Sequence, residues 1–221
     1  MSFLSSFWSI FKTNKPAAPE DHNPLRIKLG SIIGMGDQFR LLTAGSSEVR
    51  GIAADSPVEG KGVIDIGDGY RLHRFYTSDV DMMLQVRTSG YDDNHVEEVI
   101  LFNYLECQTV NTEQELQRLA GASSPIGLPT FQHNDKTFNR VWGTEPGQTE
   151  LVRMIEKVKN PDAAYEVQHL SMLYSRETDL SERTEFLLFS VEETREPNGE
   201  RTVQISTCVG LTVFANDINV I

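Results

Sequence analysis

The stretch TEFLLFSVEETREPNGERTVQISTCVGLTV, residues 184–213, decides the fold because it contains two strands joined by a tight turn. The first arm is apolar on both parities over residues 186–191, which predicts a strand inside a sheet, covered on both faces. Asn198-Gly199 supplies the positive φ angles that hairpin turns need. In the second arm one parity is apolar, which predicts one buried and one wetter face: Val203, Ile205, Val209, Leu211 and Val213.

Further strands are predicted on the N-terminal side of this hairpin. Residues 96–107 surround a strong apolar run and indicate a buried strand, although a helix fits nearly as well. A helix is predicted over residues 112–120, where Thr112 can cap the first turn and Glu115 follows three residues later. Short apolar runs between turn residues predict the other strands: 25–29, 62–66, 70–76, 81–87, 137–142, 151–158 and 165–174.

These elements predict an α+β fold, predominantly antiparallel β-sheet with one or two short helices. Residues 25–221 are expected to form a β-rich globular domain. The Ser, Pro and Gly residues between positions 122 and 129 leave open a division into two subdomains, 25–128 and 129–221. Residues 1–24 are expected to be an amphipathic tail followed by a proline-rich linker.

Composition limits the class of protein. A formal net charge of -12 argues against nucleic-acid binding, which depends on clustered Lys and Arg. The two cysteines, Cys107 and Cys208, form no Cys-x-x-Cys pair and suit a reducing compartment. The N-terminus lacks the charges and cleavage site of a signal peptide, and the apolar runs fall short of the roughly 18 residues that span a bilayer. We therefore expect a cytoplasmic protein, or one peripheral to the inner membrane.

The spacing of residues in this sequence matches no catalytic or metal-binding motif. The five histidines lack metal-ligand spacing, and His73 and His169 are interpreted as histidines on a sheet surface. The pair Ser123-Ser124 lacks the nucleophile elbow of hydrolases. The paired aspartates lie near turns, where aspartate is locally favoured. The sequence thus predicts no catalytic residue, no metal and no cofactor, and favours a protein that is not an enzyme.

The N-terminal segment is the one functional feature that the residue pattern offers. On a helical wheel its apolar residues occupy one half, while the serines and Lys12 occupy the other. Such a short helix is marginal in water and needs an apolar partner. One lysine attracts anionic lipid weakly, so a protein groove or self-association is preferred to membrane-surface contact. The residues predicted to bind this partner are Phe3, Leu4, Phe7, Trp8, Ile10 and Phe11.

The chain as a whole resembles the uncharacterised YjfK-like family of bacterial proteins. The resemblance rests on its opening residues 1–4, on 25–27, on 39–42, on the strands between 70 and 85 and on the closing residues 217–221. It implies no activity and provides no functional residues. It does imply a phage-shock-protein-A-like protein as a partner, and through it a link to envelope stress.

Two functions of different classes remain open. The first is a non-catalytic adaptor that docks a protein or a membrane surface through the N-terminal segment. The second is an enzyme or small-ligand binder with a dispersed pocket. An exposed apolar patch or an unpaired strand edge would favour the first. A large pocket would favour the second if several of these residues lined it: His73, His95, His133, Asp65 and Asp81.

Overall fold

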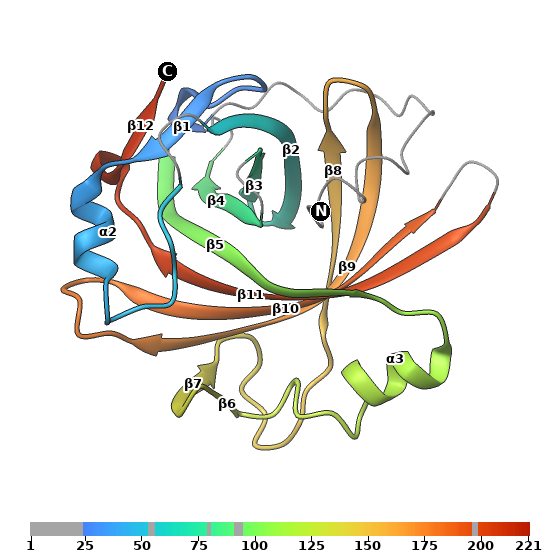
Figure 1. Cartoon of the computed structure of the whole chain (residues 1–221). Coiled ribbons are helices and arrows are strands. Elements are labelled where there is room, and N and C mark those ends of the chain that lie inside the picture. Colours follow the sequence, from blue (N-terminus) through green and yellow to red (C-terminus); the bar gives the residue numbers. More distant parts are fainter. Residues whose placement is uncertain (1–23, 53–55, 79–80, 91–94, 196–198) are drawn as a thin grey trace.

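A computed structural model describes residues 24–52, 56–78, 81–90, 95–195 and 199–221, and shows mostly antiparallel β-structure (Figure 1). The strands of this part are β1 (Ile32–Met35), β2 (Ser56–Gly67), β3 (Tyr70–Thr77), β4 (Met82–Ser89), β5 (His95–Thr109), β6 (Thr130–His133), β7 (Lys136–Arg140), β8 (Val152–Lys159), β9 (Ala164–Glu177), β10 (Thr184–Arg195), β11 (Arg201–Thr212) and β12 (Ile218–Val220). Its α-helices are α2 (Asp37–Thr43) and α3 (Glu113–Ala120). The predicted antiparallel fold with short helices is thereby confirmed.

Eight of the described strands close into a barrel, a more specific arrangement than the predicted sheet. Their order is β2-β3-β4-β5-β11-β10-β9-β8, and every neighbouring pair is antiparallel. The barrel closes where β8 pairs with β2, from Lys61↔Lys159 to Ile64↔Glu156. Strands β2 to β5 precede residue 128 in the sequence and β8 to β11 follow it, so both parts of the chain build the same wall.

Alternation along β11 places one parity inside the barrel and the other outside. Cys208 packs with Phe102 and Leu188 in an apolar group inside the barrel, whereas Val209 belongs to the larger core outside it. Both positions are 1% exposed, as is Ser206. The wetter face predicted for this arm is therefore wrong at these positions, because its polar parity points into a closed barrel and not into solvent.

The larger core lies between the barrel wall and the segments that cover it. Phe75, Leu101 and Val209 on the outside of the wall belong to the same cluster as Phe39 of α2 and Phe138 of β7. Figure 1 shows α2, β1 and β12 along one side, and β6, β7 and α3 beyond the wall formed by β5, β11 and β10. Burial of this surface holds the strands at fixed positions and leaves the interior free to carry polar groups.

Local predictions succeeded where a capping or turn signal was present. Thr112 Oγ1 accepts a hydrogen bond from the Glu115 N–H at 3.2 Å, as the pattern before α3 predicted. Residues 96–107 lie in the strand β5, so the prediction of a strand in preference to a helix is confirmed there.

The strand predicted at 25–29 is wrong, because Leu25 and Arg26 have positive φ angles and form a 3-10 turn, η1 (Pro24–Arg26). Among the described residues, no helix is long and apolar enough to cross a membrane.

Candidate functional site

One end of the barrel interior is filled by apolar side chains. The first group comprises Met83, Ile100, Phe102, Leu173, Phe186, Leu188 and Cys208. A second group, Ile64, Leu72 and Met154, lies beside it, and Trp142 packs against both groups. This end therefore has the close packing of an ordinary hydrophobic core.

The middle of the interior contains a buried cluster of charges. Glu156 of β8 is fully buried, and its Oε2 lies 2.9 Å from Arg74 Nη1 and 2.8 Å from His169 Nε2. Tyr76 donates its hydroxyl to Glu156 Oε1 at 2.7 Å. The four side chains come from β3, β8 and β9, which place them on the inward parity of the barrel. The carboxylate thus has contacts on both oxygens, as a buried charge requires.

Polar neighbours extend this cluster around the barrel. Arg74 Nε donates to Gln85 Oε1 at 3.0 Å. His169 Nδ1 lies 3.0 Å from Ser190 Oγ, which in turn lies 2.8 Å from Ser171 Oγ. The imidazole thus lies between the carboxylate of Glu156 on one side and the hydroxyl of Ser190 on the other. The serines therefore orient the imidazole toward the carboxylate.

The environment of Glu156 determines its protonation state. Burial alone would raise the pKa of this carboxyl, but Arg74, His169 and Tyr76 stabilise the anion and lower the pKa to about 2. Burial, and then the charge of Glu156, raise the pKa of the Tyr76 phenol well above its ordinary value. At neutral pH the cluster therefore contains an ionised Glu156 and an un-ionised Tyr76.

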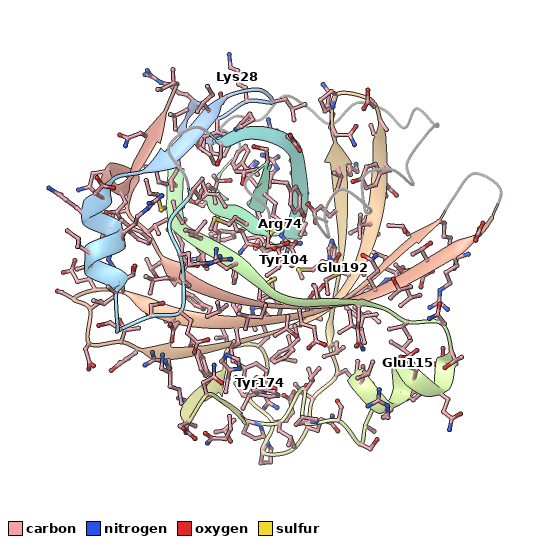
Figure 2. All side chains as sticks on the ribbon, in the orientation of Figure 1. Lys28, Arg74, Tyr104, Glu115, Tyr174 and Glu192 are labelled. Carbon is pink, nitrogen blue, oxygen red and sulfur yellow. The ribbon has the colours of Figure 1, made fainter. Side chains whose placement is uncertain are left out.

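A cavity of about 300 Å³ adjoins this cluster inside the barrel. Three tyrosines line it, Tyr76, Tyr104 and Tyr165, together with aliphatic side chains such as Val158 and Val167. Four carboxylates also line it: Asp81, Glu106, Glu156 and Glu192. Figure 2 shows Arg74, Tyr104 and Glu192 on the inner side of the wall and Tyr174 on its other side. Glu156 and His169 are buried, the three tyrosines and Glu192 are half-buried and Glu106 is exposed, so the cavity runs from a buried floor toward the surface.

Glu192 is a second charged group of the cavity and acts on its neighbours Cys107 and Tyr165. It lies on β10 opposite Gln204 of β11 and His169 of β9, and it accepts a hydrogen bond from Ser206 Oγ at 2.7 Å. Burial, followed by the charge of Glu192, raises the pKa of the Cys107 thiol to about 11. Burial and the charges of Glu156 and Glu192 also raise the pKa of Tyr165. Both groups therefore stay protonated at neutral pH.

Of the five residues named from the sequence as a test for a pocket, the structure places Asp81 in the cavity. His73 is buried with its Nε2 3.0 Å from Thr88 Oγ1, and His133 faces Glu48 at 3.3 Å. Asp65 accepts a hydrogen bond from the Gly67 N–H near the β2–β3 turn, and His95 is exposed. The condition set from the sequence, a pocket lined by several of these five residues, is therefore not met, since Asp81 alone among them lines this cavity.

The residues of the cavity floor were not predicted from the sequence. His169 was interpreted as a surface histidine, but it is 2% exposed and points into the barrel. A usable signal was present in β10, because the polar Ser190 lies between the large apolar residues Phe189 and Val191 in a strand too apolar to have a free face. Within the described ranges, no three His, Cys, Asp or Glu side chains are grouped to hold a metal ion.

The residues predicted to bind a partner, Phe3, Leu4, Phe7, Trp8, Ile10 and Phe11, lie outside the described residues. Their docking role therefore stays a prediction.

Comparison with known proteins identifies a family whose function is described as unknown. The model of a family described as "Protein of unknown function (DUF2491)" matches residues 6–219. The chain is 31% identical over 219 residues to the uncharacterized protein YjfK of Escherichia coli (strain K12), and the match covers 95% of each chain. No solved structure matches. The resemblance predicted from the sequence is confirmed, and it contributes no functional residue.

Proposed function

We propose that this chain, which belongs to the DUF2491 family of proteins of unknown function, binds a small organic ligand inside its barrel. The observation that carries the proposal is a cavity of about 300 Å³ above a buried, hydrogen-bonded charge cluster. Protein interiors contain few voids larger than a water molecule. An eight-stranded barrel is just wide enough to hold one small ligand, and about 300 Å³ is the lower end of the range of ligand pockets.

The protonation states of the cavity groups support binding in preference to catalysis. A general acid or base works best with a pKa near the operating pH. The pKa of Glu156 is about 2 and that of Cys107 is about 11, so neither group exchanges a proton readily at neutral pH. The raised pKa values of Tyr76 and Tyr104 keep both phenols un-ionised. We therefore propose a receptor or carrier and not an enzyme.

A screen of small organic molecules by ligand-observed NMR tests this proposal when it is paired with a variant that fills the cavity. Gln204 is half-buried and lines the cavity, so Gln204→Trp should occupy it. The matched control is Gln168→Trp: Gln168 is also a half-buried strand residue, but it does not line the cavity and accepts from Arg153 at 2.7 Å. We expect binding to the wild type and to Gln168→Trp, and its loss in Gln204→Trp.

Two results would contradict a ligand-binding function. One is that no molecule binds to the wild type. The other is that the bound molecules bind equally to Gln204→Trp while its melting temperature shows that the barrel is intact. In the second case the molecules would occupy another surface of the chain.

We also propose that the N-terminal segment docks this ligand-binding body to a partner. The amphipathic pattern of residues 1–12 and the family resemblance support this second role. The partner would be a second copy of the chain or a phage-shock-protein-A-like protein, with weak contact to the cytoplasmic membrane surface, in a response to envelope stress. Ligand binding and docking are compatible, because the cavity residues and the segment are separate parts of the sequence.

The docking role is tested by replacing both Phe7 and Trp8 with Asp. This variant should lose self-association in sedimentation experiments, or binding to the purified phage-shock-protein-A-like protein, because each substitution puts a charge on the apolar half of the helix. Ser5→Asp together with Ser6→Asp adds the same charge on the polar half and should have little effect. Equal behaviour of the two variants would exclude docking through the apolar half.

A further inference from the structure

We infer that the ligand is a small organic cation, an ammonium group carried on an apolar body, and that Glu192 is its counter-ion. This inference rests on the proposed function, since it names the chemical class that the cavity selects. It follows from three properties of the cavity: the sign of its charge, the position of Glu192 and the aromatic character of its wall.

The charge of the cavity is negative. Among the described residues that line it there are four carboxylates and one imidazole, but no Lys or Arg. Arg74 lies next to the floor, where its Nη1 is 2.9 Å from Glu156. That pair is neutral as a unit, so the charges of Asp81, Glu106 and Glu192 remain to act on a ligand. An anion placed here would lose its hydration and meet three like charges, whereas a cation would be attracted.

Glu192 is the best placed of these three carboxylates. Glu106 is exposed, so water screens its charge more strongly, and Asp81 lies in the segment before β4 and not on a strand of the barrel wall. Glu192 is half-buried on the inward parity of β10, between Gln204 and His169. Ser206 donates one hydrogen bond to its Oε1, and an ionised carboxylate can accept several. The ligand's ammonium group can therefore provide the compensating charge.

The wall of the cavity suits the rest of such a ligand. Aromatic faces attract cations, and clusters of aromatic rings recognise alkylated ammonium groups. Three tyrosines line the cavity, and those at positions 76 and 104 are kept un-ionised by burial. Val158 and Val167 provide apolar surface for carbon atoms. A bare metal ion suits the cavity less well, because hard cations require several oxygen ligands at short range and, within the described residues, no three His, Cys, Asp or Glu side chains are grouped to provide them.

Isothermal titration with choline and with its neutral carbon isostere tests the inferred class. In the isostere a quaternary carbon replaces the nitrogen, so the two probes have the same shape and differ in charge. We expect the wild type to bind choline at least about tenfold more tightly than the isostere, mainly because the half-buried charge of Glu192 attracts the cation, with a smaller contribution from the aromatic rings. Glu192→Gln keeps an oxygen acceptor for Ser206, and it should remove most of this preference.

Glu193→Gln is the matched control. Glu193 is the next residue along β10, so it lies on the opposite parity, and its carboxylate pairs with Arg195 and Arg201 at 3.0 and 2.8 Å. This variant loses the same formal charge but should retain the preference for choline. If both variants lose the preference equally, the net charge of the chain is responsible and the role of Glu192 is overturned.

The outcome also separates this inference from the proposed function. If the isostere binds as tightly as choline and Gln204→Trp abolishes both, the cavity binds ligands but does not select cations, and the inference fails alone. If neither probe binds and the NMR screen also finds no ligand, the proposed function fails together with the inference.

Discussion

Oε1 of Glu156 occupies the space that a Cβ atom on Gly62 would take. Gly62 lies on β2, paired with Arg74 of β3 on one side and with Val158 of β8 on the other, at the line where the barrel closes. The absence of a side chain at this position lets the carboxylate of Glu156 approach the backbone of β2 while it contacts Arg74. The closure of the barrel and the buried charge cluster therefore depend on the same glycine.

Replacing Gly62 with Ala should destabilise the protein by about 1–3 kcal/mol, the usual cost of overpacking a filled interior. The added methyl group has to displace a carboxylate that cannot move without leaving Arg74. Urea unfolding measures the change. Gly147→Ala is the control, since a Cβ there meets no atom within 4 Å and the φ angle is ordinary, so its stability should equal that of the wild type. Equal stability of Gly62→Ala would mean that Glu156 has another position available.

Replacing Glu156 with Gln should cost about 3–5 kcal/mol, because it leaves the buried Arg74 without its counter-ion. The double variant Arg74→Met with Glu156→Leu removes both charges and keeps their volume in apolar form. We expect it to be clearly more stable than the single variant, since the desolvation cost of both ions disappears. Denaturant unfolding of the wild type, of Glu156→Gln and of the double variant measures the three stabilities. A double variant less stable than Glu156→Gln would contradict this expectation. It would show that leaving Tyr76 and His169 without a polar partner costs more stability than leaving Arg74 without its counter-ion.

The elements of the fold that follow local rules were predictable from the sequence. Thr112 caps α3, and the hairpin of β10 and β11 pairs in the expected antiparallel way. Closure of the barrel was not predictable, because it depends on contacts between β2 and β8, in which Ile64 meets Glu156. A period of two shows which side chains share a face, but it does not show whether that face meets solvent or the inside of a barrel. The apolar parity of β11 was therefore assigned correctly as buried, and the cavity on its other side was missed.

The assignment of the apolar parity leads to a third prediction. Val209 is 1% exposed in the core outside the barrel wall, so Val209→Asp should place an unpaired charge there and prevent stable folding. Val152→Asp makes the same chemical change on β8, where the valine is 39% exposed. We expect it to lower the melting temperature by no more than a few degrees. Circular dichroism melts measure both, and a cooperative melt of Val209→Asp near the wild-type temperature would contradict the packing of this wall.

Acid should lower the free energy of unfolding by protonating Glu156, over a pH range that the pKa of this carboxyl defines. The pKa of this carboxyl is lowered from 4.5 to about 2 in the folded chain, because Arg74, His169 and Tyr76 together outweigh the effect of burial. A group whose pKa is lowered by folding stabilises the folded state above its unfolded pKa, and the stabilisation is lost as the pH falls toward the folded pKa. The contribution of Glu156 is therefore complete above about pH 4.5 and disappears between 4.5 and about 2. In a carboxyl-detected NMR titration its resonance should stay at the ionised position through pH 4.5, where an unperturbed glutamate is half protonated. Titration of Glu156 together with the exposed glutamates would mean that water reaches the carboxylate and that the cluster at the cavity floor is not closed.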